Sequence, residues 1–254
     1  MTIVLPAFDE AARIGPALDE LFAYLSGGAG ERPFARADVL VVDDGSTDGT
    51  AAVVAARPEA QLPPGADGAL RLIRQPHRGK GAAVRAGMLA ADGDLVLFTD
   101  ADLATPPDQL RLLVDALAEH DLALGSRVQP DGTDRRASQP AHRRLLGRLF
   151  HAFAAVWVTG PVPDTQCGCK GFRRAVARDL FGRQRIESIV FDAEIIHLAR
   201  RRGYSMVSVP VEWNDKRGSR MRLRPRLALR VLFDLLRVPL LHRRVRRAPV
   251  LAGS

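Results

Sequence analysis

The sequence has few of the features that mark secreted or membrane-spanning proteins. Only two of its 254 residues are cysteine, Cys167 and Cys169, which is too few for a disulfide framework. No apolar run reaches the roughly 18 residues that a membrane-spanning helix needs. Met1 and Thr2 lead directly into an apolar, strand-like stretch instead of a signal peptide. We therefore expect a chain that works in the reducing cytosol.

Negative charge is scarce at one end of the chain. Residues 215–247 contain 12 Lys or Arg and 2 Asp or Glu, a net charge of +10, whereas the whole chain carries +8. The rest of the chain is therefore close to neutral, at −2. A basic segment of this kind indicates an anionic partner, such as a membrane surface, a phosphate ligand or nucleic acid. Aromatic residues make up only 6% of the chain, and this argues against a nucleic-acid binder.

Strand-like and helix-like segments alternate through the first half of the chain. Apolar runs that resemble buried strands lie at 2–8, 38–44, 69–75, 94–100 and 121–127, with helical patterns between them. This alternation predicts an α/β fold, a mostly parallel sheet with helices on both faces. Further strand and helix signals follow, with residues 160–172 interpreted as a turn. We predict a catalytic domain at 1–213 and a basic loop with an amphipathic helix at 214–254.

Two carboxylates follow the strand that ends near Thr99. Asp100 and Asp102 stand two positions apart, so on an extended segment their side chains point the same way. Their mutual repulsion would be relieved by a cation, and Mg²⁺ or Mn²⁺ is typically held by one or two carboxylates together with substrate phosphates. A bare D-x-D is common by chance, and a solvated turn is the alternative. The position directly after a buried strand favours the metal site.

Two other motifs lie at predicted strand or helix ends. Asp43 closes the strand of "VVDDGSTDGT", where a carboxylate can accept hydrogen bonds from a base or ribose. Gly79 and Gly81 flank Lys80 before a helical pattern, so backbone N–H groups and one cation could face a phosphate. In parallel sheets, ligands bind at the carboxyl ends of the strands. These motifs are therefore expected to meet at one edge of the sheet.

The motifs together resemble glycosyltransferase family 2. "IVLPAFDE", "VVDDGSTDGT", "GKGAAVRAGM", "FTDADLATPPD" and "GSR" occur in the order typical of that family. "DTQCGCKGF", "FDAEIIHLARRRGY" and "VPVEW…KRGSR" resemble its polyprenyl-phosphate branch, in particular the dolichyl-phosphate β-glucosyltransferases. The resemblance covers roughly residues 2–240. It implies the GT-A nucleotide-sugar-binding fold, which is Rossmann-like.

The resemblance also implies roles for residues at matching positions. Catalytic roles fall on Asp100, Asp102, Asp164 and Arg127, with Asp100 and Asp102 as metal ligands. Nucleotide binding falls on Pro6, Phe8, Glu10, Asp43, Lys80 and Asp100. Phosphate or acceptor binding falls on Arg127, Arg143, Gln166, Lys170, Arg217, Ser219 and Arg220.

The implied reaction transfers a hexose, with glucose from UDP-glucose as the favoured donor, to a polyprenyl or dolichyl phosphate with inversion at C1. A phosphate acceptor is already anionic near neutral pH, so it needs no catalytic base, and Asp164 is expected to orient the acceptor or sugar. The chain departs from the family pattern at Ala104, where mannosyltransferases of this branch carry a glutamine ligand. GDP-mannose remains the alternative donor, a non-lipid acceptor remains open, and a D-x-D phosphatase is a remote alternative.

The predicted helix at 226–238 offers a way to reach a lipid acceptor. Arg226, Arg230, Asp234 and Arg237 fall on one narrow stripe, and nearly all other positions are apolar. A basic amphipathic helix can lie in the interface of an anionic membrane. Packing on the catalytic domain is the alternative, and both can hold in part. We expect a peripheral protein at the cytoplasmic face of a membrane, without a nucleic-acid partner, and the oligomeric state stays open.

Overall fold

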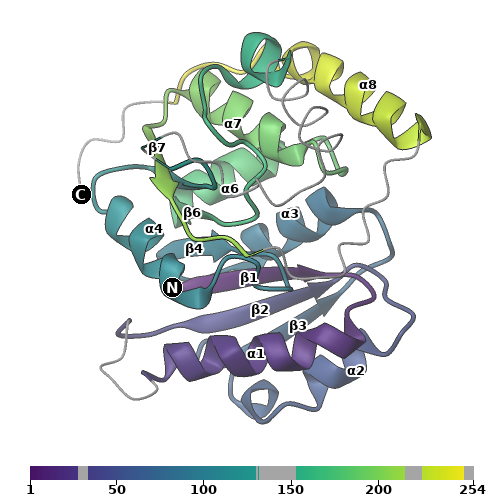
Figure 1. Ribbon diagram of the computed structural model, residues 1–254, viewed down its shortest axis with the longest axis vertical. Coiled ribbons are helices and arrows are strands. Elements are labelled where there is room, and N and C mark those ends of the chain that lie inside the picture. Colours follow the sequence, from purple (N-terminus) through teal and green to yellow (C-terminus); the bar gives the residue numbers. More distant parts are fainter. Residues whose placement is uncertain (28–33, 130, 132–152, 215–224, 249–254) are drawn as a thin grey trace.

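A seven-stranded sheet forms the centre of the molecule (Figure 1). The computed structural model describes residues 1–27, 34–129, 131, 153–214 and 225–248. The strand order is β3-β2-β1-β4-β6-β5-β7, and β6 runs antiparallel to both of its neighbours. The strands are β1 (Thr2–Ala7), β2 (Asp38–Asp43), β3 (Leu70–Arg74), β4 (Leu95–Phe98), β5 (Leu122–Ser126), β6 (Lys170–Arg173) and β7 (Met206–Pro210).

Helices cover both faces of this sheet, as the alternating pattern predicts. One apolar cluster joins the sheet to α1 (Ala11–Leu25), α2 (Thr50–Ala55) and α4 (Leu110–Ala116). A second cluster joins the other face to α3 (Lys80–Ala90), α6 (Arg174–Arg183) and α7 (Phe191–Arg202). Short 3₁₀ turns lie at Pro58–Gln61 and Pro107–Gln109. The predicted α/β class, a mostly parallel sheet between two helical layers, is confirmed.

One local expectation was wrong. Residues 160–172 were expected to form a turn, but Lys170–Arg173 pair with both β4 and β5. Proline does not interrupt the first helix, because α1 begins at Ala11 and includes Pro16. The buried face of the helix, which starts at Ile14, packs on the sheet. The free energy gained by this burial outweighs the loss of the one backbone hydrogen bond that proline removes.

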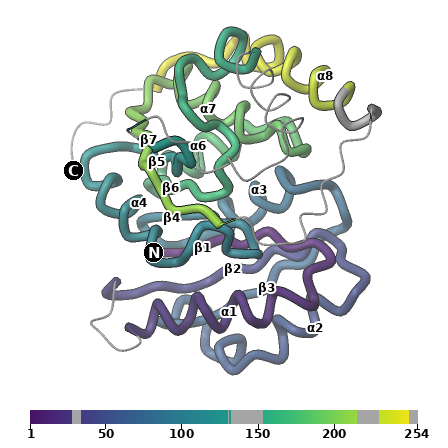
Figure 2. The backbone as a smooth tube through the Cα atoms, viewed as in Figure 1, coloured from purple at the N-terminus to yellow at the C-terminus, as the bar shows by residue number. Residues whose placement is uncertain are grey.

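A third apolar cluster attaches the C-terminal helix to the rest of the chain. It joins Leu235 and Val238 of α8 (Pro225–Leu241) to α7 and to the π-helical turn η4 (Ala155–Thr159). Figure 2 shows α8 beside α7, on the side of the molecule opposite α1. The predicted appendage is therefore a helix docked on the catalytic core. The division at residue 213 stays a prediction.

Within the described residues, no helix combines the length and apolar character that crossing a bilayer would require.

Candidate active site

The carboxyl ends of the parallel strands bring the predicted site motifs together. Asp43 is the last residue of β2, Asp100 follows β4 after one residue, and Arg127 directly follows β5. Pro6 lies near the end of β1, where its register partner is Val42. Because β1, β2 and β4 are parallel, these ends lie at one edge of the sheet. The expected clustering is confirmed for these residues.

Lys80, from the predicted phosphate motif, contacts Asp100. We call Asp100 and Asp102 the acidic pair. The Nζ atom of Lys80 lies 2.6 Å from Oδ1 of Asp100. Burial alone would lower the pKa of Lys80, but the carboxylates of Asp100 and Asp192 outweigh it and raise the pKa. The lysine is therefore a fixed positive charge at the first residue of α3.

Asp102 lies where a second carboxylate is costly to ionise. Its Oδ1 accepts a hydrogen bond of 3.0 Å from the backbone N–H of Ala104. Burial, followed by repulsion from Asp100, raises the pKa of Asp102. The pair thus carries more negative charge than its own surroundings neutralise, which is the condition that a divalent cation relieves.

The backbone around Asp100 is shaped closely to its carboxylate. Leu103 has a positive φ of 47°, an uncommon conformation for a residue of its type. A Cβ atom placed on Gly168 would lie 2.0 Å from Oδ2 of Asp100. Only glycine lets the loop before β6 pass this close, so Gly168 is a site residue that the motif analysis missed.

The donor set fits a hard divalent cation bound jointly with substrate. Among the described residues there is no group of three or more His, Cys, Asp or Glu that could enclose a metal. The two carboxylates alone match the way Mg²⁺ is held, with phosphate oxygens and water completing its shell. Ala104 supplies no side-chain ligand, as the sequence indicated.

The end of β2 offers an unsatisfied acceptor. Asp43 is fully buried, and its Oδ1 accepts a 3.1 Å hydrogen bond from the N–H of Ser46. Its Oδ2 has no hydrogen-bond partner among the described residues; Arg74 Nε lies 3.7 Å away. A buried carboxylate oxygen without a donor is costly, so this atom is suited to accept a hydrogen bond from a ligand.

Asp44, the neighbour of Asp43, organises the loop before α3. Its Oδ1 accepts hydrogen bonds from Gln75 Nε2 at 2.6 Å and from the N–H of Arg78 at 3.1 Å. Its Oδ2 accepts one from the N–H of Gly79 at 2.8 Å. Asp44 thus positions the residues that lead into Lys80. The sequence showed that Asp43 and Asp44 are adjacent acids. It did not show that Asp44 holds the loop while Asp43 keeps an oxygen without a hydrogen-bond donor among the described residues.

The β1–α1 junction carries the other predicted nucleotide-binding residues. Phe8 is partly exposed and stacks on His77, with ring centroids 4.1 Å apart. Glu10 forms a bidentate ion pair with Arg13, at 2.6 and 2.7 Å. His77 Nδ1 lies 2.9 Å from Oδ2 of Asp44, so the stacked rings lie beside the residue that follows β2, whereas the carboxylate of Glu10 is already partnered.

Arg127 and Asp164 form a buried pair with each other. Arg127 Nε and Nη2 donate to the two carboxylate oxygens of Asp164 at 2.7 and 2.8 Å, and the Arg127 N–H adds a third bond. Burial would lower the pKa of Arg127, but Asp164 outweighs it and raises the pKa. The ring of Trp213 lies 5.7 Å from the guanidinium. The nearby Gln166 keeps its Nε2 buried without a hydrogen bond among the described residues.

Lys170, which the resemblance assigns to phosphate or acceptor binding, is buried. Its side chain is 1% exposed, and its Nζ donates to Asp192 Oδ1 and to the Cys167 carbonyl, each at 2.6 Å. The ring of Phe98 lies below the ammonium. Lys170 is therefore shielded from solvent in this arrangement, and it neutralises Asp192 inside the core. Asp192, an acid at a wholly buried position of α7, was not assigned from the sequence.

The remaining predicted phosphate ligands, Arg143, Arg217, Ser219 and Arg220, lie outside the described residues.

Comparison with known proteins identifies the family. Residues 2–181 match the family described as glycosyl transferase family 2. The chain belongs to this family and is a glycosyltransferase. It is 36% identical, over 95% of its own length and 71% of the relative's, to a dolichyl-phosphate β-glucosyltransferase of Trichomonas vaginalis. A protein with the same activity in Drosophila melanogaster is 35% identical over 87% of this chain and 69% of the relative.

Solved structures support the GT-A fold of the glycosyltransferase. The UDP complex of glucosyl-3-phosphoglycerate synthase from Mycobacterium tuberculosis aligns over 93% of this chain and 79% of its own, with a TM-score of 0.61 and 22% identity. A mannosyltransferase from Pyrobaculum calidifontis with GDP-mannose and Mn²⁺ aligns over 94% and 69%, with a TM-score of 0.56 and 23% identity. At these identities the likeness concerns the fold.

Proposed function

We propose that this glycosyltransferase transfers glucose from UDP-glucose to a polyprenyl or dolichyl phosphate and forms a β-linked lipid-phosphate sugar. The observation that carries the proposal is the 36% identity to a dolichyl-phosphate β-glucosyltransferase across nearly the whole chain. The site chemistry supports it, because the acidic pair, Asp43 and Lys80 form a set suited to a nucleoside diphosphate.

The pairing of Asp164 favours an acceptor that arrives deprotonated. Both oxygens of Asp164 are bound to the Arg127 guanidinium, so this carboxylate is held as an ion and is a poor base. A phosphate monoester is largely ionised at neutral pH and needs no base. In the proposed step an acceptor oxygen attacks C1 of the sugar as the C1–O bond to the diphosphate breaks. The nucleoside diphosphate leaves with the electron pair, and the configuration at C1 inverts.

The cationic groups of the site would lower the repulsion between the two phosphate-bearing substrates. Mg²⁺ or Mn²⁺, held by Asp100 and Asp102, would supply charge neutralisation at the leaving diphosphate. Glucosyl-3-phosphoglycerate synthase, which shares the fold, has been solved with Mn²⁺ and UDP and with Mg²⁺ and UDP. In this chain Lys80 adds a positive charge at the same carboxylates. Asp43 and Phe8 would hold the ribose and base.

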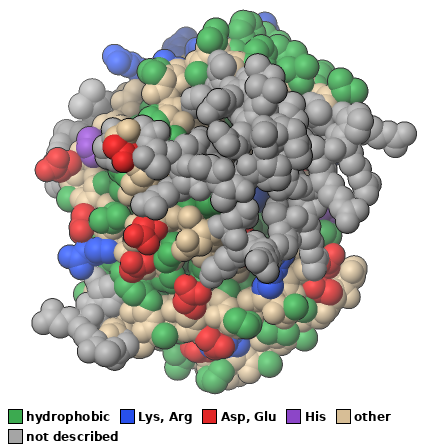
Figure 3. All heavy atoms as spheres, in the orientation of Figure 1, with side chains coloured by type: hydrophobic (Ala, Val, Ile, Leu, Met, Phe, Trp, Pro, Cys, Tyr) green, Lys and Arg blue, Asp and Glu red, His purple; other side chains and the backbone are tan. Residues whose placement is uncertain are grey.

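The exposed face of α8 supports a membrane-bound acceptor. Leu229, Leu232, Phe233, Leu236 and Leu240 recur at helical spacing, and all are exposed; Leu229 is 68% exposed. The indole of Trp157 donates to the Leu236 carbonyl, so the exposed apolar residues of η4 join this face. Figure 3 shows hydrophobic side chains gathered at the upper right, where α8 lies. We call these residues of α8, with Val156 and Trp157, the α8 face.

The α8 face would rest in the headgroup region of a membrane, which would place the enzyme at the cytoplasmic surface. An apolar helical face with flanking arginines is the pattern of an interfacial helix. Leu232→Ser with Leu236→Ser should reduce co-sedimentation with lipid vesicles, because both side chains point away from the core. Leu112→Ser, an exposed leucine of α4, is the matched control. Equal binding of both variants would contradict the membrane assignment.

A donor and acceptor screen tests the reaction. The purified protein is incubated with UDP-glucose or GDP-mannose, with and without polyprenyl phosphate, and the lipid-linked sugar is identified by mass. We expect product from UDP-glucose only when both polyprenyl phosphate and a divalent cation are present. If GDP-mannose gives the lipid-linked sugar and UDP-glucose does not, the alternative donor is established. If the donor is turned over equally well with and without polyprenyl phosphate, the proposed acceptor is refuted.

A further inference from the structure

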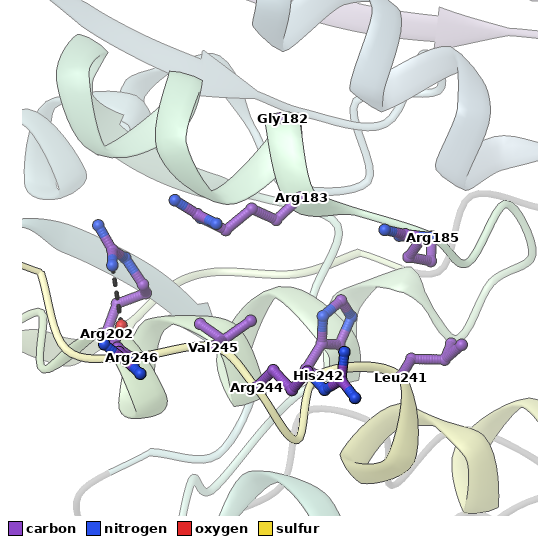
Figure 4. Close-up of a pocket in the computed structure, with 9 residues that line it drawn as sticks. All are labelled: Gly182, Arg183, Arg185, Arg202, Leu241, His242, Arg244, Val245 and Arg246. Atoms are coloured by element: carbon purple, nitrogen blue, oxygen red, sulfur yellow. Dashed lines mark hydrogen bonds between the residues drawn. The ribbon is translucent and has the colours of Figure 1, made fainter.

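A cavity lined by arginine lies between the end of α6 and the segment that follows α8. Its volume is about 620 Å³, within the range of small-ligand sites. Figure 4 shows side chains from both segments around the same space. The lining residues are Gly182, Arg183, Arg185, Arg202, Leu241, His242, Arg244, Val245 and Arg246. We call this the arginine pocket. Its lining includes neither Asp100 and Asp102 nor any of the residues predicted to bind the nucleotide.

The walls of the arginine pocket are held by specific contacts. Arg202 donates to Asp179 at 2.6 Å and to the carbonyl of Arg246 at 2.8 Å. His242 Nε2 lies 2.6 Å from Oε1 of the fully buried Glu194 in α7. These bonds tie the segment after α8 to α7, so the position of the Arg246 backbone is fixed by the fold.

Positive charge in the pocket exceeds the negative charge beside it. Asp179 accepts from Arg183 and Arg202, while Arg185, Arg244 and Arg246 have no side-chain partner among the described residues. With Glu194 counted as well, the five arginines leave a formal surplus of three positive charges. Gathering like charges around a cavity is unfavourable unless an anion enters it. Guanidinium groups match phosphate oxygens in pairs, so a phosphate group is the anion that the lining fits.

The place of the pocket indicates where that phosphate comes from. Leu241 lines the cavity, and the preceding Leu240, which is 65% exposed, belongs to the α8 face. A phosphate that enters beside this apolar surface can remain attached to lipid chains buried under the same helix. We propose that the arginine pocket binds the phosphate headgroup of an anionic phospholipid and thereby fixes how the enzyme sits on the membrane. The inference rests on the proposed membrane association and not on the transfer reaction.

Arg244→Gln with Arg246→Gln is the test variant, because neither side chain has a partner within the described part of the chain. Arg243→Gln with Arg247→Gln is the matched control: it removes the same charge from the same segment, but neither residue lines the pocket. Affinity for phosphatidylglycerol vesicles should fall about tenfold more in the test variant than in the control, as expected for the loss of one charge-assisted hydrogen bond. Equal losses would show diffuse attraction and overturn the proposal.

A soluble phospholipid separates the pocket from the membrane. Short-chain phosphatidylglycerol below its micelle concentration should bind the native protein and the control variant, measured by calorimetry, and should fail to bind the test variant. No binding to the native protein would overturn the pocket even if vesicles bind. Inorganic phosphate that binds as tightly as the phospholipid would overturn the lipid assignment. Glucosyl transfer to a detergent-dispersed acceptor should be unchanged in the test variant, so failure of the transfer reaction is seen separately.

Discussion

Replacing Lys170 tests whether its buried pair stabilises the fold or serves a substrate. Lys170→Met keeps the length of the side chain but removes the ammonium that bonds to Asp192 at 2.6 Å. Asp192 is then left in the core without its closest cation. Breaking a buried pair in this way costs about 3–5 kcal/mol. For a domain of this size, 1 kcal/mol changes the melting temperature by about 2–4 °C, so we expect a fall of roughly 6–20 °C.

The pH dependence of this loss follows from Asp192. Burial already raises its pKa, and Lys170 opposes that shift. Without Lys170 the pKa of Asp192 in the folded state rises further. Asp192 then keeps its proton in the folded state at a pH where it is already ionised in the unfolded chain. The folded state then binds more protons than the unfolded state, and stability falls as pH rises. Melting curves should therefore show a larger deficit at pH 8 than at pH 5.

The double variant Lys170→Met/Asp192→Leu completes the test. An apolar pair of similar size should restore most of the lost stability, because no charge is left unpaired. If Lys170 is structural, the restored protein keeps its KM for polyprenyl phosphate. A normal melting temperature for the single variant would refute the reasoning about burial. A stable double variant with a raised KM would instead establish a phosphate contact for Lys170.

Three further substitutions, at Asp102, Gly168 and Phe8, test the acidic pair and the predicted nucleotide site. Asp102→Asn should abolish metal-dependent transfer but raise the melting temperature of the metal-free protein at neutral pH, since burial and Asp100 raise the pKa of Asp102 and disfavour its ionised form; a lower melting temperature would contradict this. For the same reason metal binding should weaken, as acid is added, at a higher pH than an ordinary aspartate predicts. Gly168→Ala should reduce turnover by about a hundredfold by displacing the Asp100 carboxylate, whereas Gly182→Ala, with open space around it, should leave turnover unchanged. Phe8→Ala should weaken UDP binding about tenfold in calorimetry through lost stacking, and unaltered affinity would exclude the ring from the base site.

The sequence predicted the sheet where hydrophobic period and length agree. The strands after Thr2, Asp38 and Leu95 are continuous apolar runs, and their ends located Asp43 and Asp100 at one edge. β6 escaped prediction because it is four residues long and begins with a lysine. That lysine can be buried only because Asp192, 22 residues later, meets it in the folded protein. No local pattern contains this information.

The C-terminal helix shows the same limit in another form. Its apolar period was visible, but the sequence left open whether the helix lies on a membrane or packs on the catalytic domain. Asp234, a member of the charged stripe, is buried and accepts a 2.7 Å hydrogen bond from Ser188. One side of α8 therefore packs on the core through Leu235 and Val238, and the apolar α8 face remains outside. Which side packs depends on a partner surface that the helix sequence does not specify.

The pairing of charges narrows the residues that can receive the acceptor phosphate. Two of the residues that the resemblance assigns to phosphate or acceptor binding already have acidic partners: two side-chain donors of Arg127 bind Asp164, and Lys170 binds Asp192. Two phosphate-bearing substrates still have to be neutralised, and Lys80 is a single charge already engaged with Asp100. We therefore expect further cations from elsewhere in the chain, and the sequence places Arg143 in one candidate segment and the "KRGSR" stretch in another. Acceptor affinity should therefore depend more on those segments than on the arginine and lysine buried beside β5 and β6.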